Sequence, residues 1–490
     1  MWISRRCFNL SLLGSAAATR LAALAPRPKL LVLVVLEQLR PEELELLTPS
    51  LRPAGLRKLL YGGAHFPDCR HAASTFSASS LATLSTGAWP SQHGIVADSW
   101  LDRGTRRPVP ASGESLLATT LSDQIAAAPH TRAYTLAMDA TQCGFVSAPS
   151  AARQFWFDAS GQMATLGDPP AWLAEFNRAH SPDNLHGEAW RAIDARASAP
   201  PLRTLTFHPA RPREFVHLYQ SSPFGQQAQF DLLGQLIEEE DLGQGNSFDF
   251  VTLVAGATAK LGYEIGGRDP LMRQLILHLD RQLETLLAHL AKATGEHGFN
   301  LVLAGAHGAP PAPAPESRAR MAVDGESIAQ AVNRVLTATG DGRVLRYLYP
   351  FLYLDITPGR DPEAVRVAAG RAALEHASVA GYYTSGGHCS TADGWEPRFR
   401  NSFHPTRSGD VMLSYRPEYV EDFGQGRGIS YGSLYNYDVR VPLCFYGPQF
   451  RAGIFEAPVE SVDLSPTLAR AMGVAVPSSA TGRVLGEAFA

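Results

Sequence analysis

A single histidine stands where chemistry is expected in an α/β protein. The stretch "LVLAGAHGAP", residues 301–310, has the pattern of a buried strand that ends in a loop of small residues, with His307 at that end. Ligands of open α/β sheets bind at the carboxyl ends of strands, so the position favours a metal site. The preceding Gly305 and Ala306 offer no side-chain ligand atom. His307 is therefore either the remnant of a metal site or a hydrogen-bonded core histidine.

A second set of metal-binding side chains, His388, Cys389 and His404, lies in one loop-rich region. Their spacing fits no closed zinc site, which makes this region the lesser candidate. Other catalytic signatures are missing from the sequence. It has no G-x-S-x-G elbow, no H-E-x-x-H, no P-loop and no G-x-G-x-x-G between a strand and a helix.

The elements that position His307 are predicted by apolar runs that alternate with helical patterns. A long helix is expected at residues 268–295, where leucines recur at near-helical spacing. Strands are expected at residues 29–36, 131–138, 248–256, 299–306 and 439–447. This order implies right-handed crossovers between parallel strands. The predicted fold class is α/β, with a doubly wound, largely parallel sheet flanked by helices.

Two regions interrupt this alternation. Residues 150–225 mix aromatic residues with proline and alanine, and residues 380–430 are rich in glycine, serine, arginine and histidine. Both are predicted to be insertions that cap the carboxyl edge of the sheet, where long functional loops lie. The alternative is a separate small domain. The expected plan is one domain, residues 26–490, with two cap insertions.

The first 25 residues have the character of an export signal. Arg5 and Arg6 precede a short stretch rich in alanine, serine and leucine, as in twin-arginine signals. Residues 1–25 are therefore predicted to direct the protein to the periplasm or out of the cell; a disordered leader is the alternative. The longest later apolar run, residues 30–36, is too short to span a membrane.

Charge and cysteine usage limit the partners and the covalent links. The chain of 490 residues carries 43 basic and 47 acidic side chains without a long basic run, so no nucleic-acid partner is expected. An exported chain would keep four cysteines, which allow three disulfide pairings or remain buried free thiols. These four are Cys69, Cys143, Cys389 and Cys444.

Several stretches in their order resemble the alkaline phosphatase superfamily, especially its periplasmic zinc phosphatase and type I phosphodiesterase (nucleotide pyrophosphatase) branch. They include "STFSASSLATLSTGAWPSQHGIVADSW", "LAGAHG", "YGSLYNYDVRVPLCFYG" and "VDLSPTLARAMG". The resemblance runs from about residue 29 to the C-terminus. It implies an alkaline phosphatase-like fold in which two zinc ions about 4 Å apart activate a threonine or serine nucleophile.

Only two of six metal-binding positions implied by the resemblance keep a ligand. The first carboxylate falls on Glu37, and the Asp-His-Gly signature leaves His307. The positions without a ligand are Ala259, Tyr263, Ala306 and Tyr431. Two donors cannot build a closed pair of zinc sites, although a single weakly held ion is an alternative. The two tyrosines are expected to fill the freed volume and to bond to Glu37 or His307.

The phosphate-binding positions implied by the resemblance are altered in the same way. The nucleophile falls on Ser77, which is alternatively the N-cap of a helix. The Lys-x-Arg pair falls on Met138 and Ala140, and an asparagine that touches phosphate falls on Asp98. One uncompensated like-charge pair near 4 Å costs about 4 kcal/mol at an effective dielectric of 20, which disfavours phosphate binding.

The sequence thus predicts an exported pseudoenzyme without a cofactor, although zinc is the metal of the related family. It would bind a ligand or a protein partner through its cap. The alternative is an active phosphatase or phosphodiesterase with a rebuilt site that uses Ser77, Glu37 and His307. A further alternative for Glu37 and Asp98 is that they are solvated or paired with a cap arginine such as Arg40.

Overall fold

The structure is a computed structural model that describes residues 27–196, 198–266, 269–310, 321–391, 394–417, 419–422 and 431–490. The predicted export signal at residues 1–25 lies outside the described residues. Among the helices of the described ranges, none combines the length and the apolar character that a membrane crossing requires.

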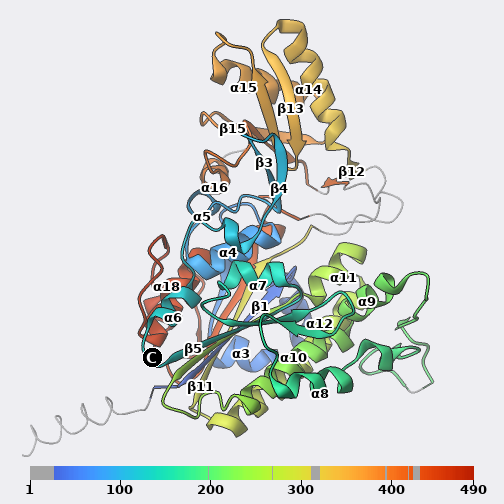
Figure 1. Cartoon of the computed structure of the whole chain (residues 1–490), viewed down its shortest axis with the longest axis vertical. Helices are drawn as coiled ribbons and strands as arrows, with labels where there is room; N and C mark the ends of the chain where they lie inside the picture. Colours follow the sequence, from blue (N-terminus) through green and yellow to red (C-terminus); the bar gives the residue numbers. More distant parts are fainter. Residues whose placement is uncertain are drawn as a thin grey trace, which may run out of the picture.

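A ten-stranded sheet forms the centre of the molecule (Figure 1). Its parallel middle runs in the order β11 (Phe299–His307), β1 (Leu30–Glu37), β10 (Phe248–Ala255), β5 (Thr131–Ala137) and β6 (Arg153–Phe157). Three antiparallel pairs extend it: β7 (Met163–Thr165) on β6, β19 (Arg440–Tyr446) on β11, and β2 (Ala64–Arg70) on β19. The short β20 (Gly453–Ile454) and β21 (Val459–Glu460) pair with β2 in parallel. The predicted α/β class with a largely parallel sheet is confirmed.

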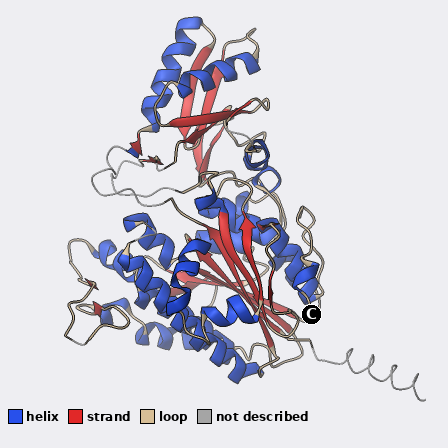
Figure 2. Cartoon of the chain, turned by 180° about the vertical axis from the view of Figure 1, so that it is seen from behind, coloured by secondary structure: helices blue, strands red, loops and turns tan. Residues whose placement is uncertain are grey.

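Helices cover both faces of this sheet because its strands are apolar on both sides (Figure 2). In β1, Leu31, Leu33 and Val35 pack with α4 (Ser77–Thr86), α6 (Leu121–Ala127) and α18 (Leu464–Met472). Leu30, Val32, Val34 and Leu36 point to the other face, which α3 (Leu56–Gly62), α10 (Pro223–Glu239) and α12 (Pro270–Thr294) cover. The leucines of the predicted long helix are confirmed as core residues. The alternation places Glu37, the next residue of β1, toward α4.

Shorter helices connect these layers and carry several site residues. They are α2 (Pro41–Leu47), α5 (Pro90–His93), α7 (Ala140–Val146), α8 (Ala171–Ala179), α9 (Pro212–Gln220), α11 (Ala257–Ile265), α16 (Glu396–Ser402) and α17 (Asn436–Val439). A hairpin of β3 (Ser99–Asp102) and β4 (Arg107–Pro110) rises from the segment after α5.

A second sheet forms a unit of its own at the top of Figure 1. It contains β13 (Gly342–Leu348), β14 (Phe351–Ile356), β17 (Val411–Tyr415), β15 (Val379–Thr384) and β16 (Cys389–Ser390), with α14 (Gly325–Thr339) and α15 (Pro362–Leu374). Residues such as Ile328, Leu352 and Leu413 give it a separate apolar core. The unit starts well before the expected insertion at 380–430. In the other expected insertion, 150–225, β6 and β7 extend the central sheet instead of capping it.

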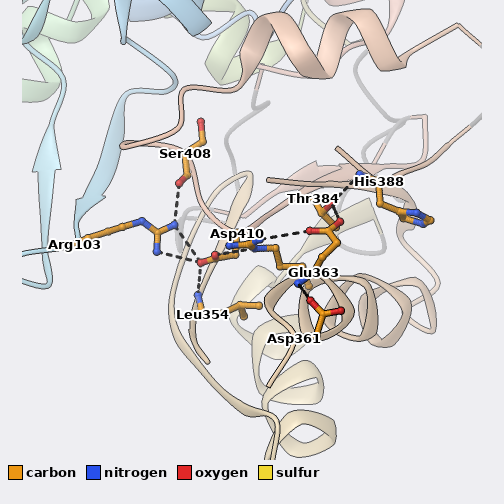
Figure 3. Close-up of polar contacts among 9 residues, drawn as sticks. Arg103, Leu354, Asp361, Glu363, Thr384, His388, Ser408 and Asp410 are labelled. Carbon is orange, nitrogen blue, oxygen red and sulfur yellow. Dashed lines mark hydrogen bonds and ion pairs between the residues drawn. The ribbon is translucent and has the colours of Figure 1, made fainter. Parts of the chain in front are cut away.

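The second unit is tied to the hairpin through the carboxylate of Asp410 (Figure 3). Arg103, at the turn of the hairpin, donates to Asp410 Oδ2 from both Nη1 and Nη2 at 3.2 Å. Arg366 of α15 donates to Oδ1 at 3.3 Å, and the backbone N–H of Leu354 donates to Oδ2 at 2.8 Å. Arg103 also donates to the carbonyl oxygen of Ser408. Because the Asp410 side chain is only 5% exposed, these charge-assisted bonds are stronger than hydrogen bonds between neutral groups.

Replacing Arg103 with alanine is expected to loosen the second unit without unfolding it. Asp410 keeps Arg366 and the amide of Leu354, so the loss of stability should be about 1 kcal/mol. Hydrogen exchange in β14 and β17 should become several-fold faster than in the wild type. Arg107→Ala, an exposed change on the same hairpin, is the control; equal exchange in both variants would contradict the role of Arg103.

The four cysteines from Cys69 onward, all of them described residues, are free thiols. Cys69, Cys143 and Cys444 are buried, and Cys389 is half-buried. Of the two interpretations of the cysteines, the structure has the free thiols and none of the three disulfide pairings.

Candidate functional site

A cavity of about 470 Å³ opens at the carboxyl edge of the central sheet. Residues at the ends of β1, β5 and β10 form its floor, and α4, α7, α9 and α11 contribute walls. The lining residues are Glu37, Ser77, Ala78, Asp98, Ala111, Met138, Asp139, Thr141, Gln142, Phe145, His217, Gly256, Ala259, Lys260, Tyr263 and Tyr431. Most of the predicted site residues are therefore brought together. Ala140, Ala306 and His307 are not among the residues that line the cavity.

The carboxylate of Glu37 is held by two side chains from different elements. The hydroxyl of Ser77 donates to Glu37 Oε1, and Nε2 of Gln142 donates to Oε2 at 2.7 Å. Ser77 is the first residue of α4 but does not cap it; Phe76 occupies the N-cap position without a side-chain hydrogen bond. The N-cap interpretation of Ser77 is wrong, because its hydroxyl is used by Glu37.

The environment of Glu37 disfavours its charge. The residue is 2% exposed, and burial raises the pKa of its carboxyl group from 4.5 to about 7, against the lowering effect of the two hydrogen bonds. Arg40, the arginine considered as its partner, pairs instead with Glu43 at 2.9 Å. Glu37 is thus neither solvated nor paired with that arginine.

Two further carboxylates, Asp98 and Asp139, are exposed on the cavity wall. Desolvation of the Asp98 carboxylate by the surrounding protein raises its pKa to about 6, and a hydrogen bond from the backbone of Ala78 partly offsets this shift. Asp139 is the N-cap of α7, where it accepts the N–H of Gln142 at 2.9 Å. Met138 lines the cavity beside it, whereas Ala140 is an exposed residue of α7.

Several polar residues that line the cavity were not predicted from the sequence, among them Asp139, Gln142, Lys260 and His217. Gln142 lies five residues beyond the end of β5, at a carboxyl edge that could have identified it. Lys260 lies in the segment "TAKLGY", between two of the positions that lack a ligand. His217 of α9 shows that part of the 150–225 region does reach the cavity. No local pattern in the sequence marks it.

His307 ends β11 beside Glu37 but is fully buried behind Tyr431. The two rings stack with centroids 4.4 Å apart. Its Nδ1 hydrogen-bonds to the carbonyl oxygen of Gly308 at 2.8 Å, and within the described chain its Nε2 has no hydrogen-bond partner. Burial lowers the pKa of His307 to about 4, so the ring is neutral at pH 7. His307 combines features of both interpretations: it is a hydrogen-bonded core histidine, and among the described residues its Nε2 has no hydrogen-bond partner.

The residues at the other four ligand positions implied by the resemblance fill space and form no described hydrogen bond to Glu37 or His307. Ala259 and Tyr263 of α11 line the cavity, and Ala306 is buried in the core of the sheet. Tyr431 packs between His307 and Phe76. Among the described contacts, neither tyrosine hydroxyl bonds to Glu37 or His307, so that part of the expectation is not observed.

The residues present do not fit a pair of zinc ions. Both carboxylate oxygens of Glu37 are used by Ser77 and Gln142, and His307 is shielded from the cavity by Tyr431. Nowhere in the described ranges do three or more histidine, cysteine, aspartate or glutamate side chains form a group that could hold a metal ion. This includes the set His388, Cys389 and His404.

Comparisons with known proteins agree with the architecture. The family model for type I phosphodiesterase / nucleotide pyrophosphatase matches residues 31–424. The chain is 23% identical to a calcium-transporting ATPase of Myroides odoratus, over 94% of this chain and 95% of that protein. It is 22% identical to alkaline phosphatase PafA of Elizabethkingia meningoseptica, over 94% of each protein.

The crystal structure of wild-type alkaline phosphatase PafA superposes on this chain with a TM-score of 0.82. The superposition covers 95% of this chain and 100% of that one, at 20% sequence identity. At this identity the likeness shows a common fold. The predicted alkaline phosphatase-like architecture is confirmed.

Proposed function

We propose that this chain, which belongs to the type I phosphodiesterase / nucleotide pyrophosphatase family within the alkaline phosphatase superfamily, keeps the hydrolase fold but has lost the two-zinc centre. In this proposal it binds a ligand in the cavity and does not hydrolyse a phosphoester there. One observation carries the proposal: of the six ligand positions implied by the family resemblance, only Glu37 and His307 keep a carboxylate or imidazole ligand. Of these two residues, only Glu37 lines the cavity.

The charge of the cavity supports the same function. A phosphoryl group would face Glu37, Asp98 and Asp139, with Lys260 and His217 as the only basic side chains in the described lining. At the positions of the family's Lys-x-Arg pair stand Met138 and Ala140. Without zinc or these cations, an anionic substrate lacks the compensation that makes its transfer from water favourable.

Metal content and hydrolysis test this proposal together. The full chain is recovered from the exported fraction without chelators, after expression with zinc and manganese supplied. We expect far less than one ion per chain by elemental analysis, and turnover of 4-nitrophenyl phosphate no faster than a mock purification. Two tightly held ions per chain would overturn the proposal. Recovery of the chain only from the cytoplasm would contradict the periplasmic or secreted location that Arg5 and Arg6 favour.

A second candidate function is hydrolysis of a phosphate ester by a rebuilt site. The hydrogen bond from Ser77 to Glu37, with Gln142 on the other carboxylate oxygen, favours it, because a nucleophile needs an oriented base. Turnover that is lost in Ser77→Ala and kept in Ser91→Ala, a serine outside the cavity lining, would support this candidate. Equal background rates in both variants would exclude it.

A further inference from the structure

We propose that the cavity binds an organic ammonium ion, a ligand opposite in charge to a phosphate group. This inference rests on the proposed function, since it treats the cavity as a ligand site without a metal pair. The groups that face the cavity indicate the class of ligand.

Acidic side chains of the cavity wall outnumber the basic ones that could pair with them. Asp98 and Asp139 are exposed on the wall, and in the described part of the chain neither forms an ion pair with a lysine, arginine or histidine. Of the two basic side chains in the lining, His217 lies 3.7 Å from Glu264 and is directed to that carboxylate. Lys260 alone opposes the two aspartates. The wall therefore attracts a cation.

The shape and lining of the cavity suit an organic cation better than a metal ion. A hard cation needs several oxygen or nitrogen ligands converging on one point, and no such group of side chains is found within the described residues. The cavity of about 470 Å³ has the size of a small-molecule site. Tyr263, Tyr431 and Met138 add apolar and aromatic surface, and aromatic rings attract alkylammonium groups.

The start of α4, where an anion would otherwise bind, already has an anionic partner. The backbone of Ala78, the second residue of this helix, hydrogen-bonds to the carboxylate of Asp98. The positive end of the helix thus faces a negative charge that belongs to the protein. An incoming phosphate would have to displace this carboxylate, whereas an ammonium ion would gain it as a partner.

Isothermal titration of the full chain at pH 7.5 tests the inference with choline, ethanolamine and putrescine as cations and inorganic phosphate as the anion. We expect at least one cation to bind more tightly than phosphate. Asp98→Asn should weaken that binding about tenfold and strengthen phosphate binding, because it removes one charge from the wall. Asp139→Asn is a second variant with the same expected loss of cation binding. Glu114→Gln, an exposed change outside the lining, should bind like the wild type.

The outcomes distinguish this inference from the function on which it rests. Phosphate binding tighter than all three cations, or cation binding equal in the wild type, Asp98→Asn and Asp139→Asn, would overturn the inference alone. Two metal ions per chain or turnover dependent on Ser77 would overturn the proposed function, whatever the titrations show. The melting temperature of each variant is measured first, so that a loss of binding is not mistaken for a loss of fold.

Discussion

Replacing Asp249 with alanine is expected to lower the free energy of unfolding by about 3 kcal/mol. Asp249 is the second residue of β10 and is fully buried. Its carboxylate accepts hydrogen bonds from Nε and Nη2 of Arg132 in β5 at 2.7 and 2.9 Å, and from the N–H of Gly243 at 2.7 Å. Alanine removes these acceptors at the amino end of β10, the end of the strand opposite to the cavity.

An exposed pair of the same residue types gives the matched control. Arg343 and Asp355 form an ion pair of 2.8 Å on the second unit, where their side chains are 60% and 36% exposed, respectively. Asp355→Ala should cost less than about 1 kcal/mol, because solvent replaces the lost partner. Urea unfolding followed by tryptophan fluorescence measures both variants. Equal losses of unfolding free energy in Asp249→Ala and Asp355→Ala would show that the burial of Asp249 does not strengthen its interactions.

Replacing Glu37 with glutamine is expected to remove a pH-dependent loss of stability of about 3 kcal/mol. Burial raises the pKa of Glu37 from 4.5 to about 7. Between these pH values the folded protein keeps a proton that the unfolded chain releases, so rising pH favours unfolding. Glutamine cannot ionise, and it retains donor and acceptor atoms for Ser77 and Gln142.

The measurement compares unfolding free energies at pH 5 and pH 8. The stability of the wild type relative to Glu37→Gln should fall between the two pH values. Burial also raises the pKa values of Asp438 and Glu421 to about 7, and these groups add a pH dependence of the same sign to both proteins. The difference between the proteins therefore isolates Glu37. Glu114→Gln is the exposed control. A pH dependence in Glu37→Gln equal to that of the wild type would show that the pKa of Glu37 is not raised in the folded protein.

The apolar runs of the central strands were enough to predict the sheet, because a strand buried on both faces must be apolar throughout. The second sheet was not predicted. The run "RVLRYLYPFLYLDI" forms β13 and β14, and nothing local tells which sheet a strand joins. Its place became clear only from the pairing of β13, β14 and β17.

Residue types at the family's positions determined much of the site's chemistry. Ala259 and Ala306 cannot bind a metal wherever they lie, since an alanine side chain has no donor atom. Which groups contact Glu37 and His307 depended on tertiary structure. Gln142 reaches Glu37 across 105 residues of sequence, and Tyr431 stacks on His307 from a distant segment.

The sequence alone thus determined the fold class and the side-chain types that stand at the positions implied by the family resemblance, because apolar periodicity and side-chain chemistry are local properties. Only the tertiary structure decided that Glu37 is buried and held by Ser77 and Gln142, that His307 is shielded, and that Asp98 and Asp139 face an open cavity. Burial, pairing and pKa depend on which distant groups share a volume, and parallel strands bring such groups together from separate parts of the chain.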